Sequence, residues 1–132
     1  TVKLFTSGFN GTLFAYGMSG TGKTYSMLGP ESVVEVIKQG GEISEDIQSQ
    51  YGIIPRAIRD IFEFMNYAIE KEGASFELMM NYFEIYKESL NDLLQPNKDQ
   101  ANNLKMMGSK VVNSYKVMID SPETIFDHIK RG

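Results

Sequence analysis

A phosphate-binding motif constrains this chain more than any other feature of its sequence. Residues 17–24 read Gly-Met-Ser-Gly-Thr-Gly-Lys-Thr and match the pattern G-x-x-x-x-G-K-[ST] at every fixed position. The glycines let the backbone form a concave nest whose N–H groups can approach phosphate oxygens. A helix after the loop adds the positive end of its dipole. The motif therefore predicts a strand, a loop and a helix that together bind a nucleoside triphosphate.

The two residues that close the motif indicate how the ligand is held. Lys23 is expected to place its ammonium on the β- and γ-phosphates, and the Thr24 hydroxyl to complete the coordination of a bridging Mg²⁺. The run Thr12–Tyr16 is apolar and bounded by Asn10-Gly11 and Gly17, which favours a buried central strand before the loop. The candidate binding residues in the loop are Gly17, Met18, Ser19, Gly20, Thr21, Gly22, Lys23 and Thr24.

Composition limits the class of protein and the other kinds of site. A chain of 132 residues with 42% hydrophobic residues predicts one globular domain. The net charge of −4, with no basic cluster, argues against nucleic acid as a partner. Because the sequence has no cysteine and His128 is its one histidine, it excludes a disulfide framework and a thiolate or multi-histidine zinc site.

The sequence also lacks the segments that direct a chain into or across a membrane. No apolar run approaches the ~20 residues of a membrane span, and residues 1–16 lack the plan of a signal peptide. We therefore expect a soluble intracellular protein without membrane insertion. The chain begins with Thr1 and passes almost at once into the predicted strand, as an excerpt of a longer protein would.

The first half of the chain predicts helices around the loop. The end of a helix is expected at Gly8, a short helix over residues 22–28, and a long amphipathic helix over residues 54–69 with Gly73 past its end. Residues 30–51 form an acidic insertion, predicted as a mobile surface loop with a helical turn at residues 32–38. Two interpretations of it stay open: a loop without a role, or one that covers the nucleotide site.

The second half predicts strands and a last helix. Both faces of Ser75–Tyr86 are apolar, which indicates a long interior strand, and residues 88–94 suggest a short amphipathic turn. A polar loop over 97–103 follows, then short strands at 104–107 and 114–119 that pair about Gly108. Ser121 is expected to cap a helix that carries His128 in a structural position. The order of elements is an α/β alternation.

Several segments together resemble the kinesin motor domain. Gly8–Met27 resembles the phosphate-loop signature of that family nearly residue for residue. Gly52–Ala57 resembles the start of the helix after the family's variable loop. Tyr82–Glu88, with Asp92–Leu94, resembles its long strand and the exit from it. The resemblance covers roughly residues 4–132 and is strongest through residue 94.

This resemblance implies a fold and a function. The fold would be an α/β P-loop NTPase three-layer sandwich, with residues 1–132 a truncated motor domain and residues 30–51 its variable acidic loop. The parent protein would be an ATPase that uses ATP and Mg²⁺ to move along microtubules, in the cytoplasm and on the cytoskeleton. Microtubule contacts would come mostly from regions outside this chain, and an absent stalk could make the protein oligomeric.

Met18 and Tyr25 are the two positions of the loop region that the resemblance singles out. Met18 stands where most kinesins carry Gln, and because that position lends mainly its backbone to the nest, we expect nucleotide binding to survive. Tyr25 matches a position that lies beside the adenine base in similar motors. Stacking on the base and packing in the core are both open for its ring.

The resemblance also shows what the 132 residues do not contain. They lack the serine-rich switch, the Asp-Leu-Ala-Gly-Ser-Glu switch, the main microtubule-binding helices and the Arg-Pro stretch near the adenine. The catalytic residues are therefore unknown, and we expect no turnover from these residues alone. The strands that flank Thr12–Tyr16 in similar motors are missing too, so we expect the isolated chain to fold poorly or aggregate.

Two other functions stay open on the sequence alone. A non-motor remnant could bind nucleotide or a partner without turnover. A small unrelated P-loop NTPase could use Asp120, after the apolar run Val117–Ile119, as its Walker B residue, although Asp120 also suits a helix start. Lys105 and Lys110 are either peripheral microtubule contacts or part of a solvated loop.

Overall fold

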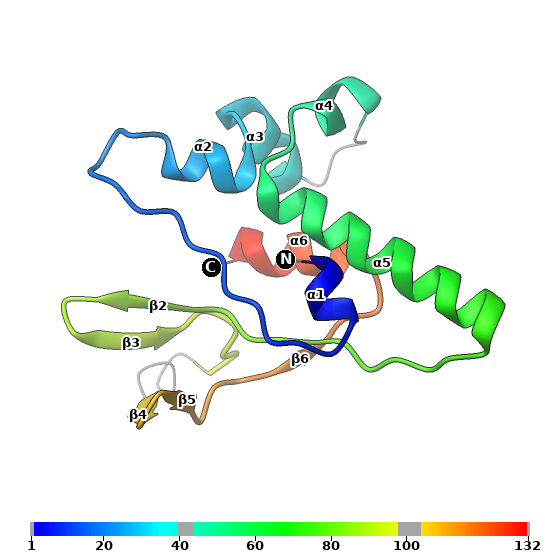
Figure 1. The fold of residues 1–132 in the computed structure, drawn as a ribbon. Helices are drawn as coiled ribbons and strands as arrows, with labels where there is room; N and C mark the ends of the chain where they lie inside the picture. Colours follow the sequence, from blue (N-terminus) through cyan, green and yellow to red (C-terminus); the bar gives the residue numbers. More distant parts are fainter. Residues whose placement is uncertain (1, 40–43, 98–103, 132) are drawn as a thin grey trace. The chain divides into compact units, whose positions relative to one another are not determined.

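The computed structural model describes residues 2–39, 44–97 and 104–131 (Figure 1). The chain divides into two compact units, Thr1–Phe76 and Glu77–Gly132. The first unit contains the helices α1 (Val2–Thr6), α2 (Lys23–Leu28), α3 (Glu31–Gln39), α4 (Glu45–Ser49) and α5 (Ile53–Glu72). The second contains the strands β1 (Met79–Met80), β2 (Phe83–Tyr86), β3 (Ser89–Asp92), β4 (Lys105–Met107), β5 (Lys110–Val112) and β6 (Val117–Met118), and the helix α6 (Pro122–Arg131).

The long helix α5 organises the first unit, as its helical periodicity predicts. Its inward face buries Pro55, Ile58, Phe62 and Ala68. The helix ends at Gly73, whose φ of 63° lets its N–H turn back to the carbonyls at the end of the helix. The α1 and α2 predictions are confirmed as well, and contacts join both helices to α5.

The acidic insertion contains more regular structure than a surface loop. The helical turn predicted at residues 32–38 is the helix α3, and α4 follows it before α5. Val33 on α3 is only 1% exposed, and Tyr51 after α4 is buried too. This part of the insertion therefore packs against its own unit, while residues 40–43 lie outside the described structure.

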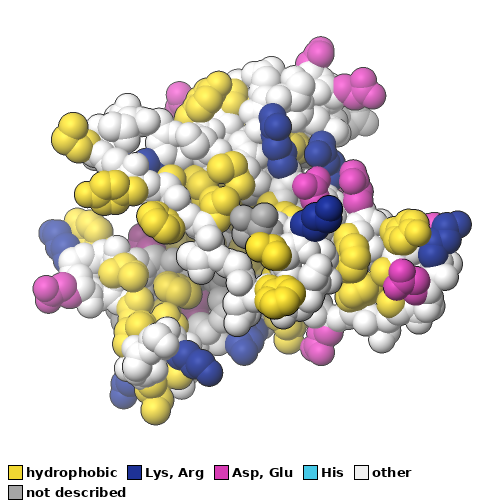
Figure 2. Space-filling model, in the orientation of Figure 1, with side chains coloured by type: hydrophobic (Ala, Val, Ile, Leu, Met, Phe, Trp, Pro, Cys, Tyr) yellow, Lys and Arg dark blue, Asp and Glu magenta, His cyan; other side chains and the backbone are white. Residues whose placement is uncertain are grey.

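The strand predicted at Thr12–Tyr16 is wrong for this structure. Residues 9–17 lie outside any helix or strand, and Tyr16 is 95% exposed. An apolar strand needs partners for its backbone N–H and C=O groups, and no described residue supplies them. Its side chains are among the hydrophobic groups left at the surface, and Figure 2 shows many such groups in yellow.

In the second unit, the predicted long strand is broken into two short ones. β1 and β2 are separated at Asn81 and Tyr82, and the interior position predicted for residues 75–86 is wrong, since none of them is buried. The amphipathic turn predicted at residues 88–94 is also wrong. Lys87 and Glu88, both with positive φ, make a tight turn that returns the chain as β3, antiparallel to β2.

The later pairing differs from prediction in its partners. β4 pairs with β5 around Gly108, and not with residues 114–119, because the turn at Gly108 brings the nearer residues together first. β6 pairs instead with β1. The helix start at Ser121 is confirmed, because the Ser121 hydroxyl accepts the Thr124 N–H. Of the polar loop predicted at residues 97–103, positions 98–103 lie outside the described residues.

Candidate phosphate-binding site

The predicted loop leads directly into α2, as the motif requires. Gly22 is the N-cap residue of α2 and has φ 85°, a conformation that side chains with a Cβ adopt at a cost. The Gly22 carbonyl accepts the Ser26 N–H at 2.9 Å, so the helical hydrogen bonds begin at the last glycine of the loop. The sequence therefore places Lys23 at the first position of the helix.

The Lys23 ammonium closes the loop on itself. Its Nζ donates to the Gly17 carbonyl at 2.8 Å and to the Met18 carbonyl at 2.7 Å. The Thr21 hydroxyl donates to the same Met18 carbonyl at 2.8 Å. Two side chains from the end of the loop thus bind the carbonyls at its beginning and curve the loop.

The other predicted binding side chains point toward solvent. Thr24 is exposed beside Lys23, where a ligand could reach its hydroxyl. Tyr25 is 64% exposed, which leaves its ring open to stacking and does not agree with packing in a core. Met18 is exposed as well, so this position contributes its carbonyl and not its side chain to the described contacts.

The far end of α2 is held by the two glycines that flank the insertion. The Gly29 N–H donates to the Tyr25 carbonyl at 2.9 Å, and the Gly52 N–H donates to the Leu28 carbonyl at 3.1 Å. A Cβ on Gly52 would lie 2.5 Å from backbone atoms of Met27 and Leu28. The α2 backbone and the chain before α5 can be this close only because residue 52 has no side chain.

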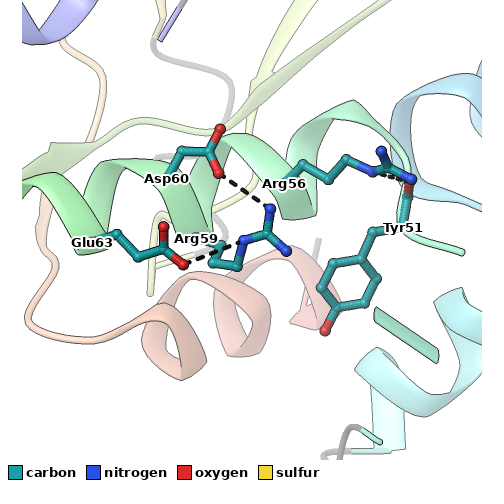
Figure 3. A network of polar contacts seen from close by, with 5 residues as sticks. All are labelled: Tyr51, Arg56, Arg59, Asp60 and Glu63. Carbon is teal, nitrogen blue, oxygen red and sulfur yellow. Dashed lines mark hydrogen bonds and ion pairs between the residues drawn. The ribbon is translucent and has the colours of Figure 1, made fainter. Parts of the chain in front are cut away.

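Arg56 fixes the chain just before α5, a role that the sequence did not indicate. Its Nε donates to the Tyr51 carbonyl at 2.8 Å, and its Nη2 to the Ser49 carbonyl at 3.1 Å. Figure 3 shows the guanidinium turned back toward Tyr51 and away from Arg59, which pairs with Asp60 and Glu63. The residue types around Arg56 gave no signal for this role, because its partners are the backbone carbonyls of Tyr51 and Ser49.

A cavity of about 650 Å³ lies in the same unit. Most of its lining is apolar, from α1, α2, α5 and the segment before the loop, and Lys3, Arg56 and Asp60 are its charged residues. Met27 of α2 and Ile53 of α5 face it together. The side of α2 that carries Met27 therefore borders this cavity.

Asp120 occupies a helix start in the second unit. Its Oδ1 accepts the Thr124 hydroxyl at 2.7 Å, and the carboxyl is exposed. This hydroxyl, followed by the Asp120 backbone N–H, holds the pKa of Asp120 below its usual range. The contacts are those of a residue at the beginning of α6, and none of them indicates a metal ligand.

Among the described residues of the second unit, Asp92 has a buried carboxylate and is 5% exposed. It accepts the Leu94 N–H at 3.0 Å and the Tyr115 N–H at 2.6 Å, and so joins the end of β3 to the chain before β6. Lys105 and Lys110 are exposed on the β4–β5 hairpin, and His128 lies half-buried on α6. The predicted structural position of His128 agrees with this burial.

The described residues contain neither a group of potential metal ligands nor a helix suited to a membrane. Among residues 2–39, 44–97 and 104–131, no three His, Cys, Asp or Glu side chains are grouped as metal ligands. None of the helices in these ranges combines the length and the apolar character needed to cross a membrane.

Comparison with known proteins gives the chain a consistent set of relatives. A family model described as "Kinesin motor domain" matches residues 1–132. The chain is 35% identical over 119 residues to "Kinesin-like protein KIN-5D" of Arabidopsis thaliana, covering 90% of this chain and 10% of that protein. It is 38% identical over 131 residues to "Kinesin-related protein 3" of Dictyostelium discoideum, covering 96% of this chain and 10% of that protein.

Solved structures agree. A structure described as that of a fast kinesin has a TM-score of 0.69 at 28% identity, over 98% of this chain and 33% of the other. Drosophila NOD, docked with bovine tubulin into a map of the nucleotide-free complex with the microtubule, has a TM-score of 0.71 at 28% identity, over 98% and 40%. The predicted α/β fold class is confirmed, and the chain spans well under half of each of these structures.

Proposed function

Because the chain belongs to the kinesin motor domain family, we propose that it is the phosphate-binding part of a motor that hydrolyses ATP to move along microtubules. Membership of the family implies nucleotide binding. The choice of ATP, the use of Mg²⁺ and the movement are our proposals, since the chain spans only 10% of each of the two curated relatives above. The observation that supports phosphate binding most is the Lys23 ammonium, which donates to the Gly17 and Met18 carbonyls and so lies within the loop.

The described geometry suggests a role for each loop residue. An ammonium group has three N–H donors, and the Gly17 and Met18 carbonyls take two of those of Lys23. The third would be available to the β- and γ-phosphates, and the loop N–H groups from Gly17 to Thr24 would surround the rest. Thr24 would supply a hydroxyl to Mg²⁺, which would neutralise phosphate charge when bound. Tyr25 would stack on the adenine.

Binding and turnover are separate in this proposal. In phosphoryl transfer the protein positions the attacking water and stabilises the charge that develops on the γ-phosphate. The 132 residues contain neither switch motif of the family, and no described contact around Lys23 offers a group for the water. We therefore propose that this part binds nucleotide and that other parts of the motor complete the catalytic site.

The partner and the location follow from the same family membership. We propose a microtubule as the partner and a cytoskeletal, microtubule-associated location in the cytoplasm. The structure of NOD with tubulin supports the partner by analogy. Lys105 and Lys110 on the β4–β5 hairpin are exposed and are the candidates for a minor contact from this chain.

The test uses the full-length protein with Lys23→Ala, and Lys116→Ala as the control that removes one exposed positive charge from the second unit. The Lys23→Ala variant should lose ATP binding and microtubule-stimulated hydrolysis, at least about a hundredfold, while Lys116→Ala stays near the unmutated rate. Thr24→Ala should bind ATP with a weaker dependence on Mg²⁺. Equal ATP binding by the unmutated and the Lys23→Ala proteins would refute the site.

A further inference from the structure

We propose that Arg56 is a positioning residue for the phosphate loop, acting through residues 49–52 and α2. This inference rests on the proposed nucleotide binding, and it goes further because Arg56 lies outside the motif. Arg56 is in the first turn of α5 and binds two carbonyls of the chain that arrives from α4. That chain is in turn bonded to the last residue of α2.

Arg56 binds the chain before α5 through two hydrogen bonds. Its Nε meets the Tyr51 carbonyl at 2.8 Å in a partly buried hydrogen bond, and its Nη2 meets the Ser49 carbonyl at 3.1 Å. Ser49 is the last residue of α4, where carbonyls have no partner within the helix and a cation is favoured. A planar guanidinium can make both bonds at once, and an ammonium or an amide cannot reproduce that fork.

Gly52 in turn contacts the backbone of α2. Gly52 donates to the Leu28 carbonyl, and its missing Cβ would meet the backbone of Met27 and Leu28 at 2.5 Å. On the other flank of the insertion, a Cβ on Gly29 would lie 2.7 Å from the Gln50 carbonyl oxygen. A contact between two backbones has no flexible side chain to absorb a shift, so movement of residues 49–52 displaces the end of α2.

Helix α2 connects the contact at Leu28 to the loop. The helix has six residues, which is about 9 Å at 1.5 Å per residue, and it begins at Lys23. The Lys23 ammonium binds the loop carbonyls at 2.8 Å and 2.7 Å, and hydrogen bonds weaken quickly with small changes of distance and angle. A shift at Leu28 therefore changes the geometry with which Lys23 meets a phosphate.

Arg59 lies near Arg56 but does not bind the chain before α5. It lies on the same helix, but its partners are Asp60 at 3.3 Å and Glu63 at 3.6 Å, both on α5. Its side chain is about half exposed and joins no other segment. Arg59→Gln is thus a matched control, since it removes the same charge from the same helix without touching residues 49–52.

The experiment measures ATP turnover by the full-length protein with microtubules, comparing Arg56→Gln, Arg56→Lys and Arg59→Gln. A displaced loop weakens ATP binding, so Arg56→Gln should raise KM for ATP about tenfold with kcat unchanged, and Arg56→Lys about threefold. Arg59→Gln should stay within about twofold. A merely structural role would lower the folded fraction, and hence the apparent kcat, at an unchanged KM. An unchanged KM for Arg56→Gln, or an equal shift for Arg59→Gln, would overturn the proposal.

Hydrogen exchange of the same proteins without nucleotide separates this inference from the proposed function. The amides of Ser26, Gly29 and Gly52 report on α2 and its contact with the chain before α5. They should exchange faster in Arg56→Gln and as in the unmutated protein in Arg59→Gln. If the protein proves not to bind ATP, the proposed function fails, yet faster exchange still supports the anchoring by Arg56. Unchanged exchange would overturn it.

Discussion

Helix α2 and residues 9–16, which lead into the loop, are close in the sequence but differ in how their backbones are satisfied. In α2 the hydrogen bonds run within the helix, and the helix end is closed by Gly29 and Gly52. Residues 10–16 make no main-chain hydrogen bond with another described residue, and Phe14 is 79% exposed. A helix satisfies itself, whereas a strand depends on residues far away in the chain.

The loop between residues 9–16 and α2 is fixed by different contacts in its two halves. Its second half is fixed by α2, and through α2 by α5 and Arg56. Its first half is fixed by Lys23 and Thr21, which bind the carbonyls of Gly17 and Met18. The side chains of the loop thus compensate, within these residues, for the support that a paired strand would give.

The largest effect that we expect is the loss of a monomer when the 132 residues are made alone. The unpaired backbone groups of residues 10–16, with exposed apolar side chains beside them, offer an edge to a second chain. Size-exclusion chromatography should show oligomers or aggregates, and heating should show no cooperative transition. A monomer with a cooperative melt would contradict this.

The source of the association can be assigned with two matched pairs of substitutions. Phe14→Lys with Tyr16→Lys should increase the monomeric fraction strongly, because it places charges on the unpaired segment. Leu4→Lys with Phe5→Lys is the control, since these exposed residues lie on α1, whose backbone is satisfied. Equal rescue by the two pairs would assign the association to exposed hydrophobic area in general.

The next effect compares two phenylalanines. Phe62 is buried on α5, so Phe62→Ala should destabilise that helix by about 3–5 kcal/mol. Phe14→Ala should change it by less than about 0.5 kcal/mol, because Phe14 already meets solvent. Hydrogen exchange of the α5 amides at low micromolar concentration gives both values. A large effect of Phe14→Ala would mean that residues 9–16 pack in solution.

The same contrast explains how much the sequence could predict. The periodicity of Ile58 and Phe62, with Gly73 after the helix, predicted α5, and the glycine and lysine spacing predicted the loop. These features depend on neighbouring residues. Thr12–Tyr16 and Ser75–Tyr86 have strand-like composition, but a strand forms only where a partner is present. The turn at Lys87 and Glu88 escaped prediction because neither residue favours a positive φ.

The candidate site shows the same division. Residues 17–24 could be proposed as the site from spacing alone, because the shape of such a loop depends on its own backbone. Arg56 could not, because its partners are carbonyls of Ser49 and Tyr51, which have no signature in the side-chain sequence. Gly52 stood out as part of a resemblance, but its contact with Leu28 required the structure.

A smaller effect is expected where α2 meets the chain before α5. Gly52→Ala puts a methyl group against the backbone of Met27 and Leu28, which should cost about 1–3 kcal/mol and speed exchange at Ser26 and Gly29. Gly73→Ala is the control. Its methyl group would meet open space, so the cost, about 1–2 kcal/mol, comes only from the positive φ and stays at the end of α5. Unchanged α2 exchange in Gly52→Ala would show that the two backbones are not in contact.

The smallest effect concerns Asp120 at the start of α6, in the second unit. Like α2, this helix start is stabilised by hydrogen bonds between residues close in the sequence. The Thr124 hydroxyl is the main cause of the lowered pKa of Asp120, so Thr124→Ala should raise that pKa toward the usual value of an aspartate. A lowered pKa in the folded state stabilises the fold above the unfolded value, near pH 4, and this contribution disappears as the pH falls through the folded value. Between about pH 5 and pH 2, the Thr124→Ala protein should therefore lose less stability than the unmutated protein.

NMR titration of ¹³C-labelled aspartate measures the shift, and Thr124→Ser, which keeps the hydroxyl, should retain the low pKa. If Thr124→Ala leaves the titration unchanged, the hydroxyl does not bind Asp120 in solution, and the helix start depends on Ser121 alone.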